Sequence, residues 1–344
     1  MGVVNQMSRR FLPFGIPLRS DFPPAHMVEK PVGFSVEELE QRTKRLQRLE
    51  NLYHKGQDAA WDGKKVLADL VKEHGPVHVD PEKRDAIRNV FGLILWGELA
   101  AWETASYLAE HIRDNTEAKM AATLQTFDEA RHFYVLRDYL RLLGIEEMPP
   151  VNSFVKTILS QILETDSVVE KLIGMQLFVE HIAVHLFKHI AEINVEPVLS
   201  HLLPYFQRDE SRHVALGKLH LPELLRELSP KETARLYLYQ LWLMGFMSMS
   251  IEYHQKDADV LGLDTRKAMM RALRDQTEMI ESMGSYSNRK GTLLLPKRLR
   301  FLNRYMLRNV YAAQGEDQAL AFKLTRPYVR RFAVSAEKVW GAIA

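Results

Sequence analysis

Apolar residues recur at helical spacing through most of the chain, and no stretch of useful length alternates as a β-strand does. The clearest predicted helix spans residues 81–113. It begins with Asp80, Pro81 and Glu82, a strong helix start, and its middle reads FGLILWGELAAWETASYL. A helix that is apolar on nearly every side belongs in the centre of a bundle. We therefore predict an all-α protein built around this segment.

The other periodic segments predict helices that surround it. They cover residues 35–54, 57–73, 116–143, 154–193 with an interruption near Asp166, 197 to about 219–222, 230–254, 264–283 and 296–311. Prolines in residues 1–34 exclude a long helix there. We expect an irregular segment with accessory helices (1–79), a four-helix core (80–225) and accessory C-terminal helices packed on it (226–344).

The composition excludes several classes of function, mainly because the chain has no cysteine and no strong net charge. Hydrophobic content of 46%, charged content of 26% and a net charge of +2 are ordinary for a soluble protein and indicate no nucleic-acid partner. The absence of cysteine excludes disulfides, thiolate zinc sites, Cys-ligated iron–sulfur clusters and a Cys nucleophile. There is no signal-peptide pattern, and the apolar run 241–251 is too short to cross a bilayer. We expect a cytoplasmic protein without a transmembrane segment.

One five-residue pattern occurs twice. Residues 128–132 read DEARH and residues 209–213 read DESRH. In each, a glutamate and a histidine stand three residues apart, which on a helix places both on one face. A single Glu-x-x-His is a weak signal, but two such extended patterns are not expected by chance. Glu129 with His132, and Glu210 with His213, are therefore candidate metal ligands.

Helix geometry indicates two further carboxylates. The first helix pair turns near residues 114–115, and Glu98 precedes that turn by about as many residues as Glu129 follows it. The second pair turns near residues 195–196, where Glu180 and Glu210 are placed in the same way. Antiparallel helices bring such residues to the same height, so Glu98 and Glu180 are the expected partners. Glu103 is about 7 Å nearer the first turn at ~1.5 Å per residue, so we expect it near the metals or as a satisfied polar group in the core.

The residue types suit a pair of hard or borderline cations. Carboxylates can bridge two metal ions, and neutral imidazoles complete the coordination while leaving positions open for O2. Two iron ions are the expected cofactor, with a manganese–iron pair as the alternative. Asp128 and Asp209 could accept the second ring N–H of the histidine in the opposite half, and Arg131 and Arg212 could pair with these aspartates.

Four helices that supply Glu, Glu-x-x-His, Glu and Glu-x-x-His resemble the ferritin-like di-iron carboxylate proteins. The repeated D-E-x-R-H pattern is similar to the hydroxylases of bacterial multicomponent monooxygenases and to ribonucleotide reductase small subunits and related oxidases. The resemblance covers residues 85–220 and implies a bundle that reduces O2 at a di-iron centre. It implies six metal-binding and catalytic residues: Glu98, Glu129, His132, Glu180, Glu210 and His213. The position of the reductase radical tyrosine is Leu136 here, which disfavours a reductase role.

We therefore expect an O2-dependent di-iron oxidase or monooxygenase acting on an apolar or aromatic substrate by hydroxylation, desaturation or N-oxygenation. One alternative is a ferroxidase or peroxide-scavenging protein. Another is a non-enzymatic helical protein whose basic segment, residues 289–308, docks an acidic partner. Candidate partners are O2, a small organic substrate, an external electron donor such as a ferredoxin or reductase, an acidic carrier protein and a second copy of the chain. The Met-rich stretch 241–249 indicates helix core, or alternatively the wall of a substrate tunnel.

Overall fold

The computed structural model describes residues 36–284 and the single residues 327 and 331, and this part of the chain is helical with no strand. The prediction of an all-α protein is confirmed. The irregular segment 1–34, the expected helix 296–311 and the basic segment 289–308 lie outside the described residues.

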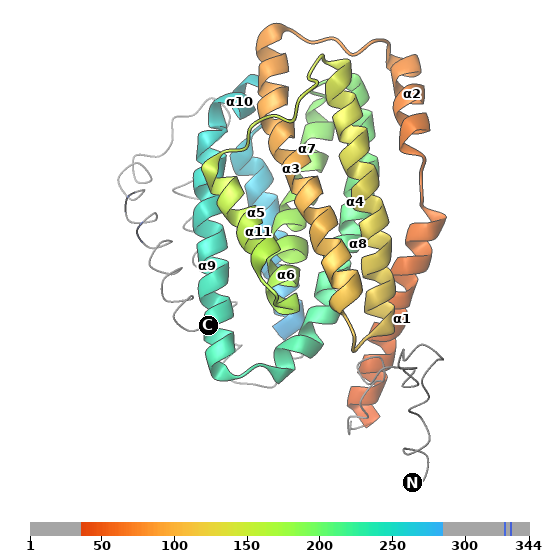
Figure 1. Cartoon of the computed structure of the whole chain (residues 1–344), viewed down its shortest axis with the longest axis vertical. Coiled ribbons are helices and arrows are strands. Elements are labelled where there is room, and N and C mark those ends of the chain that lie inside the picture. Colours follow the sequence, from red (N-terminus) through yellow and green to blue (C-terminus); the bar gives the residue numbers. More distant parts are fainter. Residues whose placement is uncertain (1–35, 285–326, 328–330, 332–344) are drawn as a thin grey trace, which may run out of the picture.

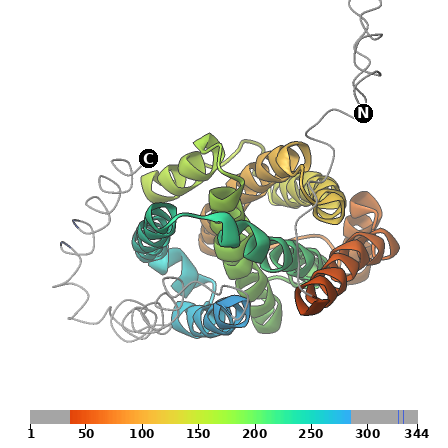
Figure 2. The same cartoon turned by 90° about the horizontal axis from the view of Figure 1, so that it is seen from below.

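Four long helices form the core, in two antiparallel pairs. They are α3 (Pro81–His111), α4 (Thr116–Leu142), α7 (Glu180–Ile193) and α8 (Pro197–Glu227). α3 packs most extensively against α4 and α7 against α8, and α4 also contacts α8 (Figure 1). Viewed from the end in Figure 2, the helices are seen close to end-on and gather around a common centre.

Side-chain caps fix where the core helices begin after their turns. Asn115 accepts the backbone N–H of Ala118 at 2.8 Å and starts α4. Glu196 accepts the N–H groups of residues 198 and 199 at 3.1 and 2.8 Å and starts α8. These bonds satisfy N–H groups that have no partner within the helix. Short capped turns fix the register of each hairpin, which decides which side chains lie at the same height.

A layer of polar side chains interrupts the apolar core at mid-height. One cluster of buried apolar residues includes Phe91, Leu95, Val135 and Phe206, and a second includes Leu108, Ala118, Phe178 and Leu216. Along all four core helices the Glu and His residues of the predicted site stand between the two clusters. The core therefore buries this polar layer.

A π-helix directly precedes Glu180. The predicted interruption near Asp166 is present: α5 (Ser153–Glu164) ends there, and α6 (Val168–Lys171) leads into the π-helical turn η3 (Leu172–Val179). The backbone N–H of Glu180 bonds to the carbonyl of Met175, five residues back. π-Helical turns are rare and occur frequently at functional sites. This one sets the direction from which α7 presents Glu180.

Helix α8 continues five or more residues beyond the end predicted for it, to Glu227. We expected Pro222 to end it, but the proline is buried inside the helix. Proline removes one hydrogen bond and crowds the preceding turn, yet tertiary contacts can outweigh that cost. Here Glu223, just after the proline, accepts a 2.7 Å hydrogen bond from Arg45 on α1 (Val36–Asp58), and this bond holds the last turns in place.

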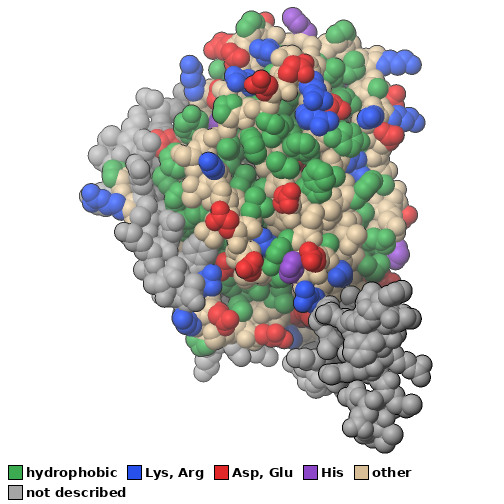
Figure 3. All heavy atoms as spheres, in the orientation of Figure 1, with side chains coloured by type: hydrophobic (Ala, Val, Ile, Leu, Met, Phe, Trp, Pro, Cys, Tyr) green, Lys and Arg blue, Asp and Glu red, His purple; other side chains and the backbone are tan. Residues whose placement is uncertain are grey.

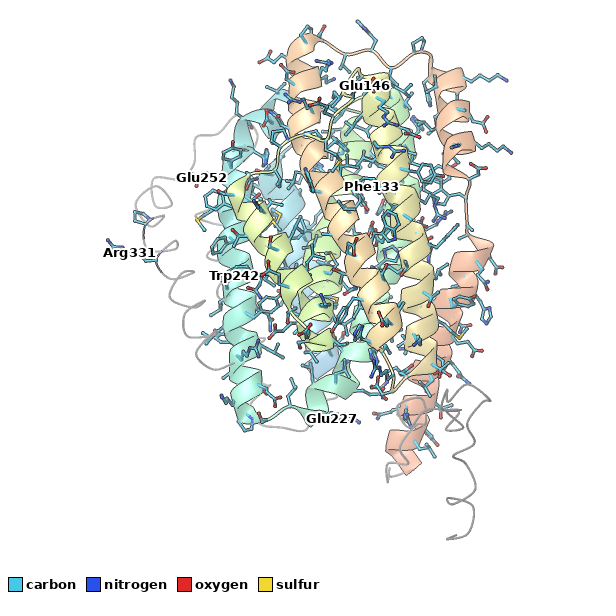
Figure 4. The ribbon with its side chains drawn as sticks, in the orientation of Figure 1. Phe133, Glu146, Glu227, Trp242, Glu252 and Arg331 are labelled. Atoms are coloured by element: carbon cyan, nitrogen blue, oxygen red, sulfur yellow. The ribbon has the colours of Figure 1, made fainter. Side chains whose placement is uncertain are left out.

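The remaining helices cover two sides of the core. α1 packs on α4 and α8, and α2 (Gly63–His74) covers the same two helices. α9 (Pro230–Tyr253) packs on α5, α10 (Gln255–Val260) contacts α3, and α11 (Thr265–Gly284) contacts α7. Trp242, labelled on α9 in Figure 4, is fully buried, as expected for the Met-rich stretch as helix core.

The outer surface is mixed in character. The face shown in Figure 3 carries charged side chains toward its upper and lower ends, with hydrophobic side chains concentrated between them. Among the described residues, no helix is both long enough and apolar enough to cross a membrane.

Candidate metal centre

Six predicted residues converge in the polar layer of the core. They form two overlapping groups whose ligand atoms lie within 4.8 Å of one another: Glu98, Glu129, His132 and Glu210, and Glu129, Glu180, Glu210 and His213. All six side chains are buried, with at most 5% of their surface exposed. Glu129 and Glu210 belong to both groups, which is where bridging carboxylates would stand between two cations.

Each imidazole directs its Nδ1 atom at the carboxylates. His132 Nδ1 lies 3.1 Å from Glu210 Oε1 and 3.4 Å from Glu98 Oε2. His213 Nδ1 lies 2.9 Å from Glu129 Oε1 and 3.2 Å from Glu210 Oε2. The two histidines thus face the centre from α4 and α8, each toward a different group.

The other ring nitrogen of each histidine contacts an aspartate of the opposite half. His132 Nε2 is 3.2 Å from Asp209 Oδ2, and His213 Nε2 is 3.3 Å from Asp128 Oδ2. A carboxylate can only accept, so the Nε2 atom carries a proton, and Nδ1 is the ring atom left to bind a metal once its own proton is displaced. The two aspartates therefore set both the orientation and the tautomer of the imidazoles.

Two arginines hold the aspartates in one network. Arg131 donates to Asp128 and, at 2.9 Å, to Asp209. Arg212 donates to Asp128 at 3.0 Å and to Asp209 at 2.6 Å. Each arginine therefore joins the α4 and α8 halves, and the charges of two buried aspartates and two arginines compensate one another.

Trp61, in the segment between α1 and α2, enters the network from outside the core. Its Nε1–H donates to Asp209 Oδ2 at 2.7 Å. Burial opposes ionisation of Asp209, but the hydrogen bonds from His132 and Trp61 and the charge of Arg212 hold its pKa well below the usual range. Asp209 therefore stays an anion and an acceptor. The lone tryptophan between helices carries no spacing signal, so the sequence did not reveal this contact.

Several buried atoms in the centre have no hydrogen-bond partner among the described residues. They are Glu129 Oε2, Glu180 Oε2 and His132 Nδ1. Four carboxylates buried beside one another are costly without a compensating charge. Bound cations would satisfy both the unpartnered atoms and the excess negative charge. Carboxylate oxygens and imidazole nitrogens suit iron and manganese, so the residues present fit a di-metal cofactor.

Without metal, the centre holds protons at neutral pH. Burial raises the pKa of Glu98 to about 8 and raises that of Glu180 well above its usual value. Burial lowers the pKa values of His132 and His213, but their contacts with the surrounding carboxylates outweigh it and raise both well above the usual value.

Metal affinity is therefore expected to rise with pH. Groups with raised pKa values are protonated below those values, and a cation must displace the protons. We expect the Mn(II) affinity to increase between pH 6 and pH 8, by up to about tenfold per pH unit for each proton displaced. Chelator-buffered titrations at several pH values measure this, and an affinity that is independent of pH would contradict it.

Two glutamines next to the centre were not anticipated from the sequence. Gln125 Nε2 donates to Glu129 Oε1 at 3.1 Å and to Glu180 Oε1 at 2.6 Å. Gln176, on the π-helical turn, donates to Gln125 Oε1 at 3.3 Å. Gln125 precedes Glu129 by four residues, and this same-face spacing is the signal that could have identified it. Its amide ties the carboxylates of α4 and α7 together.

Replacing Gln125 with leucine is expected to weaken metal binding by about 10- to 100-fold, because Glu129 and Glu180 lose the donor that orients them. Competition with a chelator measures the change. Gln176→Leu is the matched control, since Gln176 contacts Gln125 but neither carboxylate in the described structure. An unchanged metal affinity in Gln125→Leu would show that Gln125 does not position the two carboxylates.

Glu103 lies neither at the centre nor in the core, so both expectations for it are wrong. Its side chain is exposed on α3. Five residues along a helix turn the direction by about 140° beyond a full circle. Glu103 therefore points away from the side of α3 that carries Glu98.

The sequence matches no protein-family model and no curated protein. Among solved structures, it is similar to R2-like ligand-binding oxidase with an aerobically reconstituted Mn/Fe cofactor, at 18% identity and a TM-score of 0.45, covering 90% of this chain and 97% of that one. It is also similar to a variant of that oxidase with an aerobically reconstituted Fe/Fe cofactor, at 16% identity and a TM-score of 0.43, covering 86% of this chain and 92% of that one. The chain is thus similar to structures of R2-like ligand-binding oxidase over most of their length, at low sequence identity.

Proposed function

We propose that the protein is an O2-dependent di-metal oxidase or oxygenase that acts on an apolar organic substrate. The observation that carries the proposal is a cavity of about 180 Å³ that reaches the candidate metal centre. Glu98, Glu180 and Glu210 form part of its wall. One water molecule needs about 15 Å³ of such a cavity, so this cavity has room for about a dozen non-hydrogen atoms.

Most of the cavity wall is aliphatic. The side chains come from α3, α5, α7, α9, α10 and α11 and the segments beside them, and include Val90, Ile94, Ile158, Ile182, Met247 and Met269. Met247 belongs to the Met-rich stretch for which a tunnel wall was one interpretation. An apolar cavity with a few charged groups at one place is the usual form of a small-molecule site. The substrate would be held by burial of apolar surface, with its reactive part beside the three carboxylates.

The same cavity favours an organic substrate over iron uptake. A ferroxidase must bring hydrated Fe(II) to its centre and release Fe(III), and a mainly aliphatic wall makes the passage of such ions costly. Iron uptake far beyond two equivalents per chain would favour the ferroxidase alternative. The interaction-protein alternative depends on residues 289–308, which lie outside the described structure.

When bound, a pair of iron ions, or a manganese–iron pair, would supply the reduction of O2. The protein's own groups prepare the site for it. Glu98, Glu129, Glu180 and Glu210 would hold the cations, and His132 and His213 would bind them through Nδ1 after a cation displaces the proton held there. The aliphatic wall excludes water from the space where a C–H or N–H bond would be oxidised. Hydroxylation, desaturation and N-oxygenation all remain candidate reactions.

In a monooxygenation, the substrate supplies two of the four electrons that O2 takes up. The other two must come from a separate donor. The chain has no cysteine with which to hold an iron–sulfur cluster. We therefore propose an external donor such as a ferredoxin or reductase. An acidic carrier protein, a second copy of the chain and a cytoplasmic location are further proposals that follow from the sequence.

Oxygen uptake tests the proposed function. The full chain is loaded anaerobically with Fe(II), freed of excess metal and mixed with O2 and a chemical reductant, with and without apolar compounds such as alkanes and alkylbenzenes. We expect O2 consumption, and oxidised product from at least one compound. Gln176→Leu, which should keep its metal, is the positive control. A protein that holds two metal ions per chain and consumes no O2 would overturn the proposal.

A further inference from the structure

Close packing explains five glycines of the described helices. A Cβ atom built at five of them would come within 3.0 Å of a neighbouring side chain: Gly56, Gly63, Gly92, Gly174 and Gly217. At Gly92 on α3, for example, it would lie 2.5 Å from Pro149 Cβ. These positions have glycine because a larger residue would displace a neighbour.

Gly97, five residues further along α3, is different. A Cβ atom there would meet nothing within 4 Å. Its backbone is not among the positive-φ positions that favour glycine. Glycine inside a helix is also less stable than alanine, because it loses more backbone freedom on folding. Neither packing nor backbone conformation therefore accounts for this glycine.

The empty space beside Gly97 belongs to the cavity. Leu93, Gly97 and Ala101 lie at four-residue spacing along α3, and all three form part of the cavity wall. Glu98, the α3 carboxylate of the candidate centre, is the next residue and also borders the cavity. A side chain at position 97 would therefore occupy cavity volume next to this carboxylate.

We infer that Gly97 is a specificity-determining residue: its missing side chain keeps open the part of the cavity where the hydrocarbon portion of the substrate approaches Glu98. The inference rests on the proposed function for its biological meaning. It also stands alone as a statement about which apolar molecules the cavity admits. Alanine at this position would fill a small part of the cavity beside residue 97, and leucine would fill it with four carbon atoms.

Binding of straight-chain alcohols to the metal-free full-length protein tests this without catalysis. Calorimetric titrations with the series from 1-hexanol to 1-dodecanol give the chain length that binds most tightly. We expect this optimum to be about four carbons shorter in Gly97→Leu than in the unmodified protein. The affinity for the longest alcohol that the unmodified protein binds should fall at least tenfold, since each buried methylene contributes about a fourfold factor. Gly97→Ala should show a smaller shift in the same direction.

Thermal unfolding provides a folding control, because two glycine-to-alanine substitutions on α3 should shift Tm in opposite directions. Gly97→Ala is expected to raise Tm by about 2 °C, because alanine is the better helix residue and nothing obstructs it. Gly92→Ala should lower Tm, because its Cβ would meet Pro149.

Two results would overturn the inference. One is that the unmodified protein, Gly97→Ala and Gly97→Leu all bind an alcohol of the same chain length most tightly. The other is no alcohol binding by the unmodified protein. If the expected shift is found while the iron-loaded protein consumes no O2, the inference stands and the proposed oxygenase function fails.

Discussion

Replacing Glu129 with alanine is expected to abolish binding of both metal ions, whereas replacing Glu98 should leave about one. Glu129 belongs to both groups of candidate ligands, while Glu98 belongs to one. Loss of Glu98 leaves a complete second group around Glu180 and His213. Loss of Glu129 removes a carboxylate from each group, and with it a negative charge that would compensate both cations.

Elemental analysis after anaerobic Fe(II) loading and desalting measures this difference. Glu103→Ala is the matched control, because Glu103 is an exposed glutamate on α3 and its loss should leave metal content unchanged. Glu129→Gln keeps the side-chain volume and tests whether charge or packing is responsible. If Glu129→Ala still bound two metal ions per chain, the assignment of Glu129 as a bridging carboxylate would be wrong.

Asp209→Ala is expected to have the largest effect on stability, about 3–5 kcal/mol. The variant leaves the buried Arg131 with fewer acceptors and removes the group that accepts from His132 and Trp61. Removing one partner from a buried ionic network leaves the remaining charge uncompensated. Metal affinity should fall as well, by about 10- to 100-fold, because His132 loses the acceptor that orients its ring.

Urea unfolding of the metal-free protein separates the stability effect from metal binding. Asp138→Ala serves as the control, because Asp138 pairs with two arginines on the partly exposed side of α4. Exposed pairs contribute less than about 1 kcal/mol. A loss in Asp209→Ala no larger than that of the control would show that the buried network contributes little to the fold.

The positions of Glu98 and Glu180 could be predicted because they depend only on local geometry. Counting residues from a helical turn gives height along an antiparallel hairpin, and the caps at Asn115 and Glu196 keep those turns short. The contacts between the histidines and the aspartates of the two halves were expected from the need of a metal-binding imidazole for an acceptor at its other nitrogen. The prediction for Glu103 is wrong. Counting residues gives the position of a side chain along the helix axis but not its direction around the axis, and Glu103 points away from the side that carries Glu98.

Other features depend on contacts between segments far apart in the chain. The π-helical turn before Glu180 has no recognised sequence signal, and Trp61 reaches Asp209 from a loop 148 residues away. The last turns of α8, beyond Pro222, are contacted by Arg45 of the first helix, which lies 178 residues away in the sequence. The cavity depends on seven α-helices together, so its apolar residues could not be distinguished from ordinary core in the sequence.

The most direct test of the central claim is a crystal structure of the full chain after anaerobic Fe(II) loading, with anomalous scattering recorded at the iron edge. We predict two neighbouring anomalous peaks about 3.5–4 Å apart. Both should lie between Glu129 and Glu210, with one beside His132 and the other beside His213. A fully loaded protein with no anomalous peak among these six side chains would contradict the account.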